Sequence, residues 1–141
     1  MNPQQNPALS EGQVGRAPQG QTVQYTSLSS CLTVTVTLQN GEQVGGHLSL
    51  SVPTQAGAHP SDQVLSEMNR LIGNDQIASV HIEGYGDTWS PSFLAVPAFG
   101  VNGDSNYIHR RPQEGGMDQM RQAICQQLGY RGQNVTTNNL D

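Results

Sequence analysis

The sequence predicts an α+β fold, a layered sandwich with a central, mostly antiparallel or mixed β-sheet and two main helices. Three observations support this prediction. One stretch alternates apolar residues with threonines, which is the period of a strand with one buried face. Two later stretches carry apolar residues at helical spacing. Strand-like segments lie before, between and after these helices, in an order typical of layered domains.

Composition narrows the functional classes. The chain has 141 residues, six arginines, no lysine and eleven acidic residues, for a net charge of −5. We expect no nucleic-acid binding, because that affinity depends on basic residues that neutralise phosphates. We also expect no membrane span and no Sec-type signal peptide, since the apolar runs are too short. Residues 1–20 are mostly polar and predict a flexible tail, followed by a single domain over residues 21–141.

A β-hairpin is predicted over residues 32–52, after a strand over residues 22–28. A two-residue Asn40-Gly41 turn would put the apolar residues of the two strands on opposite faces. A three-residue loop, with Gly41 in a left-handed bulge position, puts them on one face, and burial of one face sets the register. The predicted pairs are Leu38 with Glu42, Val36 with Val44, Leu32 with Leu48, and Thr33 with His47.

The second half of the chain predicts both helices. Pro60 suits the first turn of one helix, and Gly73 and Gly129 suit the two helix ends. We expect helices over residues 60–72 and 117–128, strands over 76–83 and 92–96, a short strand around 107–108, and an edge strand over 134–137.

The predicted register brings a thiol and an imidazole to one face of the sheet. With Thr33 opposite His47, Cys31 lies one diagonal step from His47, and such neighbours are about 7–8 Å apart. An imidazole that takes the thiol proton creates a thiolate, which attacks a carbonyl or carboxamide carbon. The imidazolium then protonates the leaving amine or ammonia. The alternative interpretation is that Cys31 is a small buried residue of the strand.

The residues around this pair resemble the cysteine–histidine protein-glutamine deamidases. The similar segments are Leu28-Ser29-Ser30-Cys31, a hairpin, and then Gly45-Gly46-His47. In toxins like cytotoxic necrotizing factor and Burkholderia lethal factor, the cysteine sits in a Leu-Ser-Gly-Cys motif. In the CheD-type chemoreceptor deamidases, the cysteine follows Gly-Ser and the histidine follows Gly-Gly. The resemblance covers residues 22–52.

This resemblance implies that Cys31 is the nucleophile and His47 the general base. It further implies that Thr26 orients the histidine, with Tyr25 or a backbone carbonyl as alternatives. The implied reaction converts a glutamine of a target protein to glutamate and needs no cofactor or metal. We expect a monomeric, secreted bacterial effector or toxin that acts in the host cytosol, with the bacterial cytoplasm as the alternative. The absence of lysine favours the host, because it leaves no side chain for ubiquitin attachment.

Four further side chains are candidates for substrate binding, namely Tyr25, Ser30, Tyr85 and Trp89. The histidines show no close paired spacing, so no zinc site is expected. Three other functions remain open. They are a chemoreceptor-type deamidase, a papain-like amidase or peptidase, in which the cysteine would open a helix rather than a strand, and a non-catalytic binding module.

Overall fold

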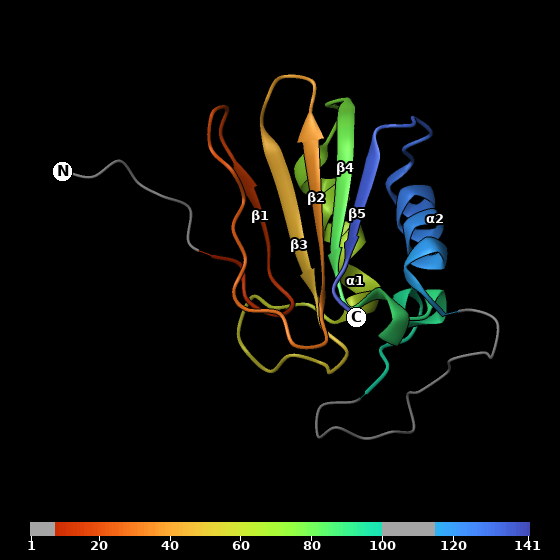
Figure 1. The fold of residues 1–141 in the computed structure, drawn as a ribbon. Coiled ribbons are helices and arrows are strands. Elements are labelled where there is room, and N and C mark those ends of the chain that lie inside the picture. The colour runs from red at the N-terminus through yellow and green to blue at the C-terminus, as the bar shows by residue number, and fades with distance from the viewer. Residues whose placement is uncertain (1–7, 100–114) are drawn as a thin grey trace.

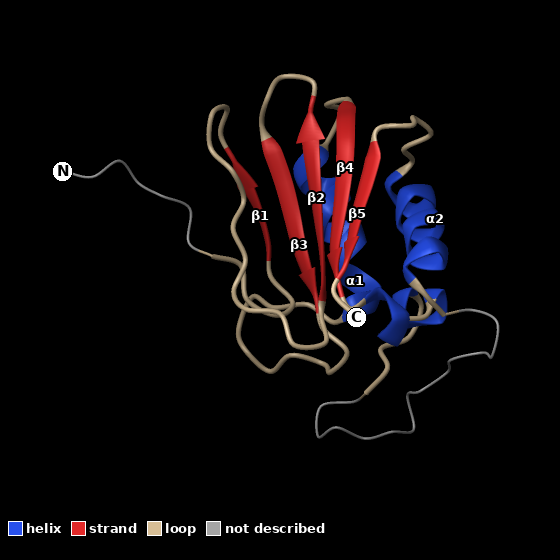
Figure 2. Ribbon diagram, in the orientation of Figure 1, coloured by secondary structure: helices blue, strands red, loops and turns tan. Residues whose placement is uncertain are grey.

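The computed structural model describes residues 8–99 and 115–141, which form a mixed five-stranded sheet covered by two helices on one face (Figures 1 and 2). The strands are β1 (Val14–Ala17), β2 (Leu32–Leu38), β3 (Gln43–Leu48), β4 (Ile77–Gly84) and β5 (Val135–Asn139), in the spatial order β1-β3-β2-β4-β5. The α-helices are α1 (Ser61–Ile72) and α2 (Met117–Leu128). Neighbouring strands are antiparallel except β4 and β5, which are parallel. The predicted α+β sandwich is confirmed.

The β2–β3 hairpin has the predicted register. Val36 pairs with Val44, Leu32 with Leu48, and Thr33 with His47. The Leu38 N–H donates to the Glu42 carbonyl at 2.8 Å, and Gly41 has a φ of 90°. This positive φ favours glycine, as the three-residue loop requires. Hydrophobic patterning and turn chemistry therefore determine which residues share each face of the sheet.

Both predicted helices are found within one residue of their expected bounds. The buried side of α1 consists of Val64, Leu65, Met68 and Ile72, apart from the buried Ser61 at its start, and that of α2 of Met117, Met120, Ile124 and Leu128. These side chains pack on the inner face of the sheet, where Leu32, Val34 and Val36 of β2 are fully buried. One apolar core therefore lies between the sheet and the helices.

The expectation that residues 1–20 form a flexible tail is wrong for the part that the structure describes. Val14–Ala17 is strand β1, which pairs with β3 at the edge of the sheet. Leu9 is buried and bridges Tyr25. The Arg16 guanidinium donates to the Leu71 carbonyl and to two carboxylates. Backbone pairing and these few anchors order a segment whose polar composition predicts disorder.

Three strand predictions also need correction. Residues 22–28 form no strand, and only an isolated bridge occurs there. The second hairpin strand ends at Leu48 rather than at residue 52. Residues 92–96 lie mostly in a 3-10 helix, η2 (Pro91–Leu94), because a proline at the first position favours a helical turn. The edge strand after α2 is confirmed as β5, whereas the strand around residues 107–108 lies outside the described residues.

Candidate active site

Two glycines set the position of His47 on β3. A Cβ at Gly46 would lie 2.6 Å from the Met68 sulfur, and a Cβ at Gly45 would lie 2.3 Å from the Tyr25 hydroxyl. Residues 45 and 46 point to opposite faces of the strand. Their lack of side chains lets α1 pack closely on the inner face and Tyr25 on the outer face. The Gly-Gly pair therefore fixes the strand immediately before His47.

The His47 imidazole lies on the outer face, opposite Thr33, and is fully buried. Its Nδ1 is 2.8 Å from the Leu9 carbonyl oxygen. Since a carbonyl only accepts hydrogen bonds, Nδ1 carries the hydrogen, and the lone pair of the neutral ring is on Nε2. Within the described chain, Nε2 is buried and has no hydrogen-bond partner. The ring is thus held at one nitrogen and left free to accept a proton at the other.

The Leu9 carbonyl is itself held in place by the Thr26 segment. It accepts the Thr26 backbone N–H at 3.0 Å and lies 3.5 Å from the Thr26 hydroxyl. The backbone of His47 is also tied to the N-terminal segment, because Gly12 N–H donates to His47 O at 2.7 Å. The group that orients the histidine is therefore a backbone carbonyl, one of the predicted alternatives. Thr26 acts on that carbonyl rather than on the ring.

Cys31 directly precedes β2 and is 1% exposed. Its thiol donates to Glu11 Oε1 at 3.4 Å. Burial, and after it the negative charge and the hydrogen bond of Glu11, together raise the pKa of the thiol to about 12. No hydrogen bond links Cys31 to His47 in the described chain, since Nε2 is unpaired. The register places His47 opposite Thr33, two residues after Cys31, but the resting thiol is protonated and bonded to Glu11.

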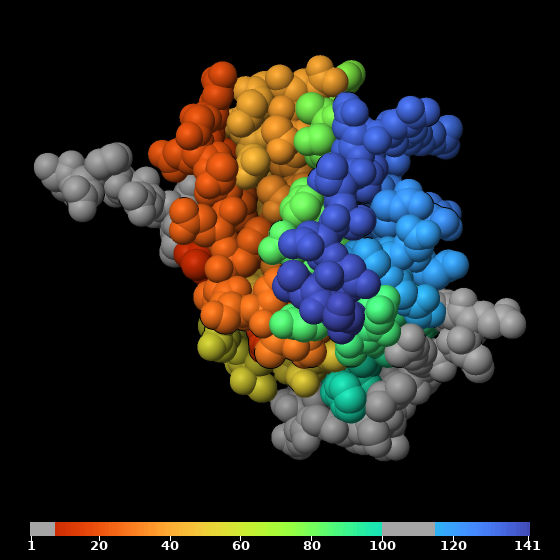
Figure 3. Space-filling view, viewed as in Figure 1, coloured from red at the N-terminus to blue at the C-terminus, as the bar shows by residue number. Residues whose placement is uncertain are grey.

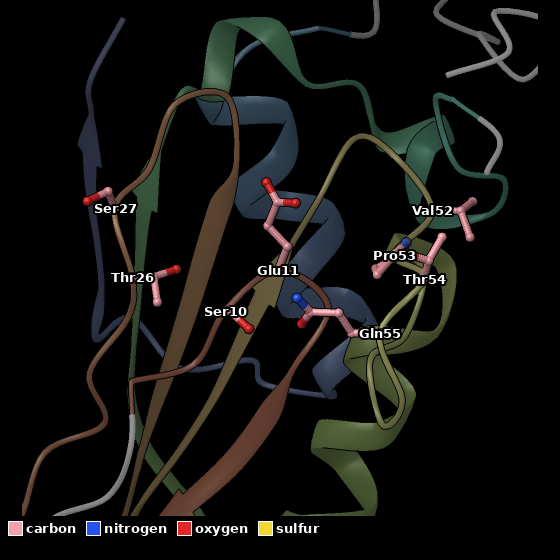
Figure 4. Close-up of a pocket in the computed structure, with 8 residues that line it drawn as sticks. All are labelled: Ser10, Glu11, Thr26, Ser27, Val52, Pro53, Thr54 and Gln55. Carbon is pink, nitrogen blue, oxygen red and sulfur yellow. The ribbon is translucent and has the colours of Figure 1, made fainter. Parts of the chain in front are cut away.

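An open pocket of about 400 Å³ is lined in part by Glu11, the hydrogen-bond partner of this thiol, whereas Cys31 itself is not one of the lining residues (Figure 4). It is lined by Ser10, Glu11, Thr26, Ser27, Val52, Pro53, Thr54 and Gln55. Figure 4 shows the Glu11 side chain between the irregular segment that carries Thr26 and the loop that carries Gln55. The space-filling view in Figure 3 shows the molecule from the same side as Figure 1, where the sheet lies in front of α1. The pocket offers mostly hydroxyl and amide groups to a ligand.

The residues predicted to bind substrate have different positions. Trp89 is fully buried in the core, so its side chain is not open to a substrate as predicted. Its indole N–H donates to the Ser30 carbonyl at 2.8 Å, and Tyr85 N–H donates to the Cys31 carbonyl at 3.2 Å. The Tyr25 hydroxyl donates to the Val34 carbonyl at 2.9 Å. In this structure, these groups support the main chain around the cysteine and histidine.

Sequence reasoning missed Leu9 and Glu11, which lie in the segment predicted to be a tail. Leu9 contributes a backbone atom, which no side-chain pattern reveals. An isolated leucine and the first carboxylate of the chain, within a polar run, are the only signals that the sequence offers.

In residues 8–99 and 115–141, no three His, Cys, Asp or Glu side chains lie close enough together to hold a metal ion. No helix in these same residues is long and apolar enough to cross a membrane. Comparison with protein-family models, curated proteins and solved structures gives no match. Functional inference therefore depends on the geometry of the site.

Proposed function

We propose that this chain is a protein-glutamine deamidase that uses Cys31 as nucleophile and His47 as general base. The observation that carries the proposal is the state of the imidazole, bonded through Nδ1 to the Leu9 carbonyl and buried without a partner at Nε2. An unpaired buried nitrogen costs stability, so its presence opposite Thr33, two residues after a free cysteine, favours a functional role. The position of Cys31 before a strand argues against a papain-like enzyme.

The reaction starts from a neutral thiol and a neutral imidazole. When substrate enters, the thiol leaves Glu11 and transfers its proton to His47 Nε2 as Sγ attacks the carboxamide carbon. The C–N bond then breaks, and ammonia leaves with the proton from Nε2, which gives a thioester. Water gives one proton to Nε2 and adds its oxygen to the thioester carbon. The C–S bond then breaks, which releases the side-chain carboxylic acid of glutamate, and the proton on Nε2 returns to the Cys31 sulfur.

The starting state explains the order of these events. Because burial and Glu11 raise the pKa of the thiol, little thiolate exists before substrate binds at neutral pH. Proton transfer must therefore accompany the attack, and the free lone pair on Nε2 is the acceptor that this step needs. The Leu9 carbonyl stabilises the imidazolium that forms, as the orienting group does in hydrolytic triads.

The proposed setting is a bacterial effector or toxin that modifies a host protein in the host cytosol, with the bacterial cytoplasm as the alternative. The absence of lysine supports the host cytosol, because it removes the side-chain amines used for ubiquitin attachment. The partner is the target protein that carries the glutamine. A chemoreceptor as target would instead indicate the chemotaxis type of deamidase.

The test is mass spectrometry of host lysate incubated with the protein in heavy-oxygen water. Each glutamine hydrolysed by the enzyme acquires one heavy oxygen, which distinguishes it from glutamate already present. We expect this label with the wild-type chain and with Cys125→Ser, which removes the other free cysteine. We expect no label with Cys31→Ser or His47→Gln. If no glutamine is labelled in a Cys31-dependent way, in either host or bacterial lysate, the deamidase proposal is wrong.

A non-catalytic binding module is the second candidate. The near-complete burial of Cys31 and its hydrogen bond to Glu11 favour it, because both are expected of a structural cysteine. The same experiment separates the two functions. A module leaves every glutamine unlabelled and keeps its ligand when Cys31 is replaced by serine.

A further inference from the structure

The exposed side chain of Glu11 lies beside the Cys31 thiol. Its Oε1 accepts the Cys31 thiol at 3.4 Å. The neighbouring Gly12 is held on both sides, because its N–H donates to His47 O at 2.7 Å and its carbonyl accepts His59 N–H at 2.7 Å. Leu9, two residues before Glu11, is buried, and its carbonyl oxygen accepts a hydrogen bond from the His47 ring. The main chain on both sides of Glu11 is thus held in place, and its exposed side chain contacts the nucleophile.

The same carboxylate gives the adjacent pocket its charge. Among the residues that line the pocket, Glu11 is the only one with an ionisable side chain. The other polar lining residues are serine, threonine and glutamine, which are neutral. A carboxylate accepts hydrogen bonds and donates none. A ligand with N–H donors therefore fits beside Glu11, next to the thiol that Glu11 accepts, whereas a ligand carboxylate faces a like charge.

We propose that Glu11 is a specificity-determining residue that selects neutral carboxamides and excludes carboxylates at Cys31. This inference rests on the proposed deamidase function and deepens it. A glutamine side chain presents two N–H donors, and one of them replaces the thiol as the partner of Glu11 when Sγ attacks. The product carboxylate has no donor and is repelled, so the same residue promotes product release. The favoured substrates are glutamines in neutral or basic surroundings.

The test compares two alkylating reagents, iodoacetamide and iodoacetate. Both transfer a substituted methyl group to sulfur and lose iodide, but one carries a carboxamide and the other a carboxylate. The rate of each at Cys31 is measured by peptide mass spectrometry in the Cys125→Ser background and divided by its rate with glutathione. The ratio of the two normalised rates cancels the ionisation of the thiol. It therefore reports charge selection alone.

We expect this ratio to favour iodoacetamide at Cys31 by about tenfold, because a like charge within several ångströms changes a surface rate by about this factor. Glu11→Gln should bring the ratio to within about twofold of glutathione, whereas Glu11→Asp should keep the preference. The matched control is Glu67→Gln on α1, which changes the net charge equally on the helix side of the sheet and should leave the ratio unchanged.

Three results would overturn the proposal. The first is a wild-type ratio equal to that of glutathione, and the second is an equal effect of Glu11→Gln and Glu67→Gln. The third is complete protection of Cys31 from both reagents, because the pocket would then not admit a carboxamide to the thiol. Circular dichroism of each variant confirms folding. Alkylation needs no turnover, so these outcomes are independent of whether glutamine labelling in lysate supports the deamidase.

Discussion

Replacing His47 by leucine tests whether the site carries a stability cost. The substitution removes the Nδ1 hydrogen bond to Leu9, which is worth about 1 kcal/mol. The Leu9 carbonyl keeps the Thr26 N–H, so no acceptor is left unpaired. The substitution also removes the buried, unpartnered Nε2, whose desolvation costs about 1–3 kcal/mol. We therefore expect His47→Leu to be neutral or to stabilise the fold by up to about 2 kcal/mol, while abolishing glutamine labelling.

The assay is urea unfolding followed by the fluorescence of the single tryptophan, Trp89, which is fully buried. Thr33→Val is the matched control, because Thr33 lies opposite His47 and its hydroxyl donates to the Glu83 carbonyl at 3.2 Å. Loss of this satisfied bond should reduce the free energy of unfolding by about 0.5–1 kcal/mol. If His47→Leu lowers the free energy of unfolding by more than Thr33→Val, the buried Nε2 does not destabilise the fold and the reasoning fails.

Three further predictions concern the surroundings of the pair. Gly45→Ala should lower the free energy of unfolding in urea by about 1–3 kcal/mol, because the new Cβ would lie 2.3 Å from the Tyr25 hydroxyl; an unchanged midpoint would contradict this close packing. Trp89→Phe should cost about 1–2 kcal/mol in thermal unfolding, since it leaves the Ser30 carbonyl without its indole donor; a loss below that of a surface substitution would count against the contact. The pKa of Cys31 is raised from 9.0 to about 12, so its contribution to stability is complete below pH 9 and is lost as the pH rises towards 12, by at most about 1.4 kcal/mol per pH unit. Cys31→Ser should flatten this alkaline loss, measured as urea midpoints against pH, and a parallel profile would refute the shifted pKa.

The hairpin was predictable because two independent constraints agree. Apolar alternation in residues 32–38 and the turn preference of Gly41 lead to one register, and that register places Thr33 opposite His47. The helices were predictable for a similar reason, since each apolar stripe ends at a glycine. Gly73 and Gly129 indeed follow the last helical residues.

The N-terminal segment was not predictable because its order comes from long-range contacts. β1 needs the edge of β3, and Arg16 needs the carboxylates of Glu42 and Asp75 from elsewhere in the chain. Trp89 was misplaced for a related reason. A tryptophan in a glycine-rich loop suits either a cleft or a core, and only tertiary packing shows that the indole is buried.

The N-terminal segment also affects how the function of this protein can be mapped. The atom that orients His47 belongs to the main chain of Leu9, so an alanine scan leaves it in place and reports residue 9 as a packing position. A sequence motif defined by side chains would omit the Leu9 carbonyl for the same reason. Trimming the polar residues up to position 20, as their composition invites, would instead remove the orienting carbonyl, Glu11 and an edge strand together. This site is sensitive to changes in the backbone. Examples are deletion of residues 8–10, or replacement of the peptide bond between residues 9 and 10 by an ester, which weakens the Leu9 carbonyl as an acceptor.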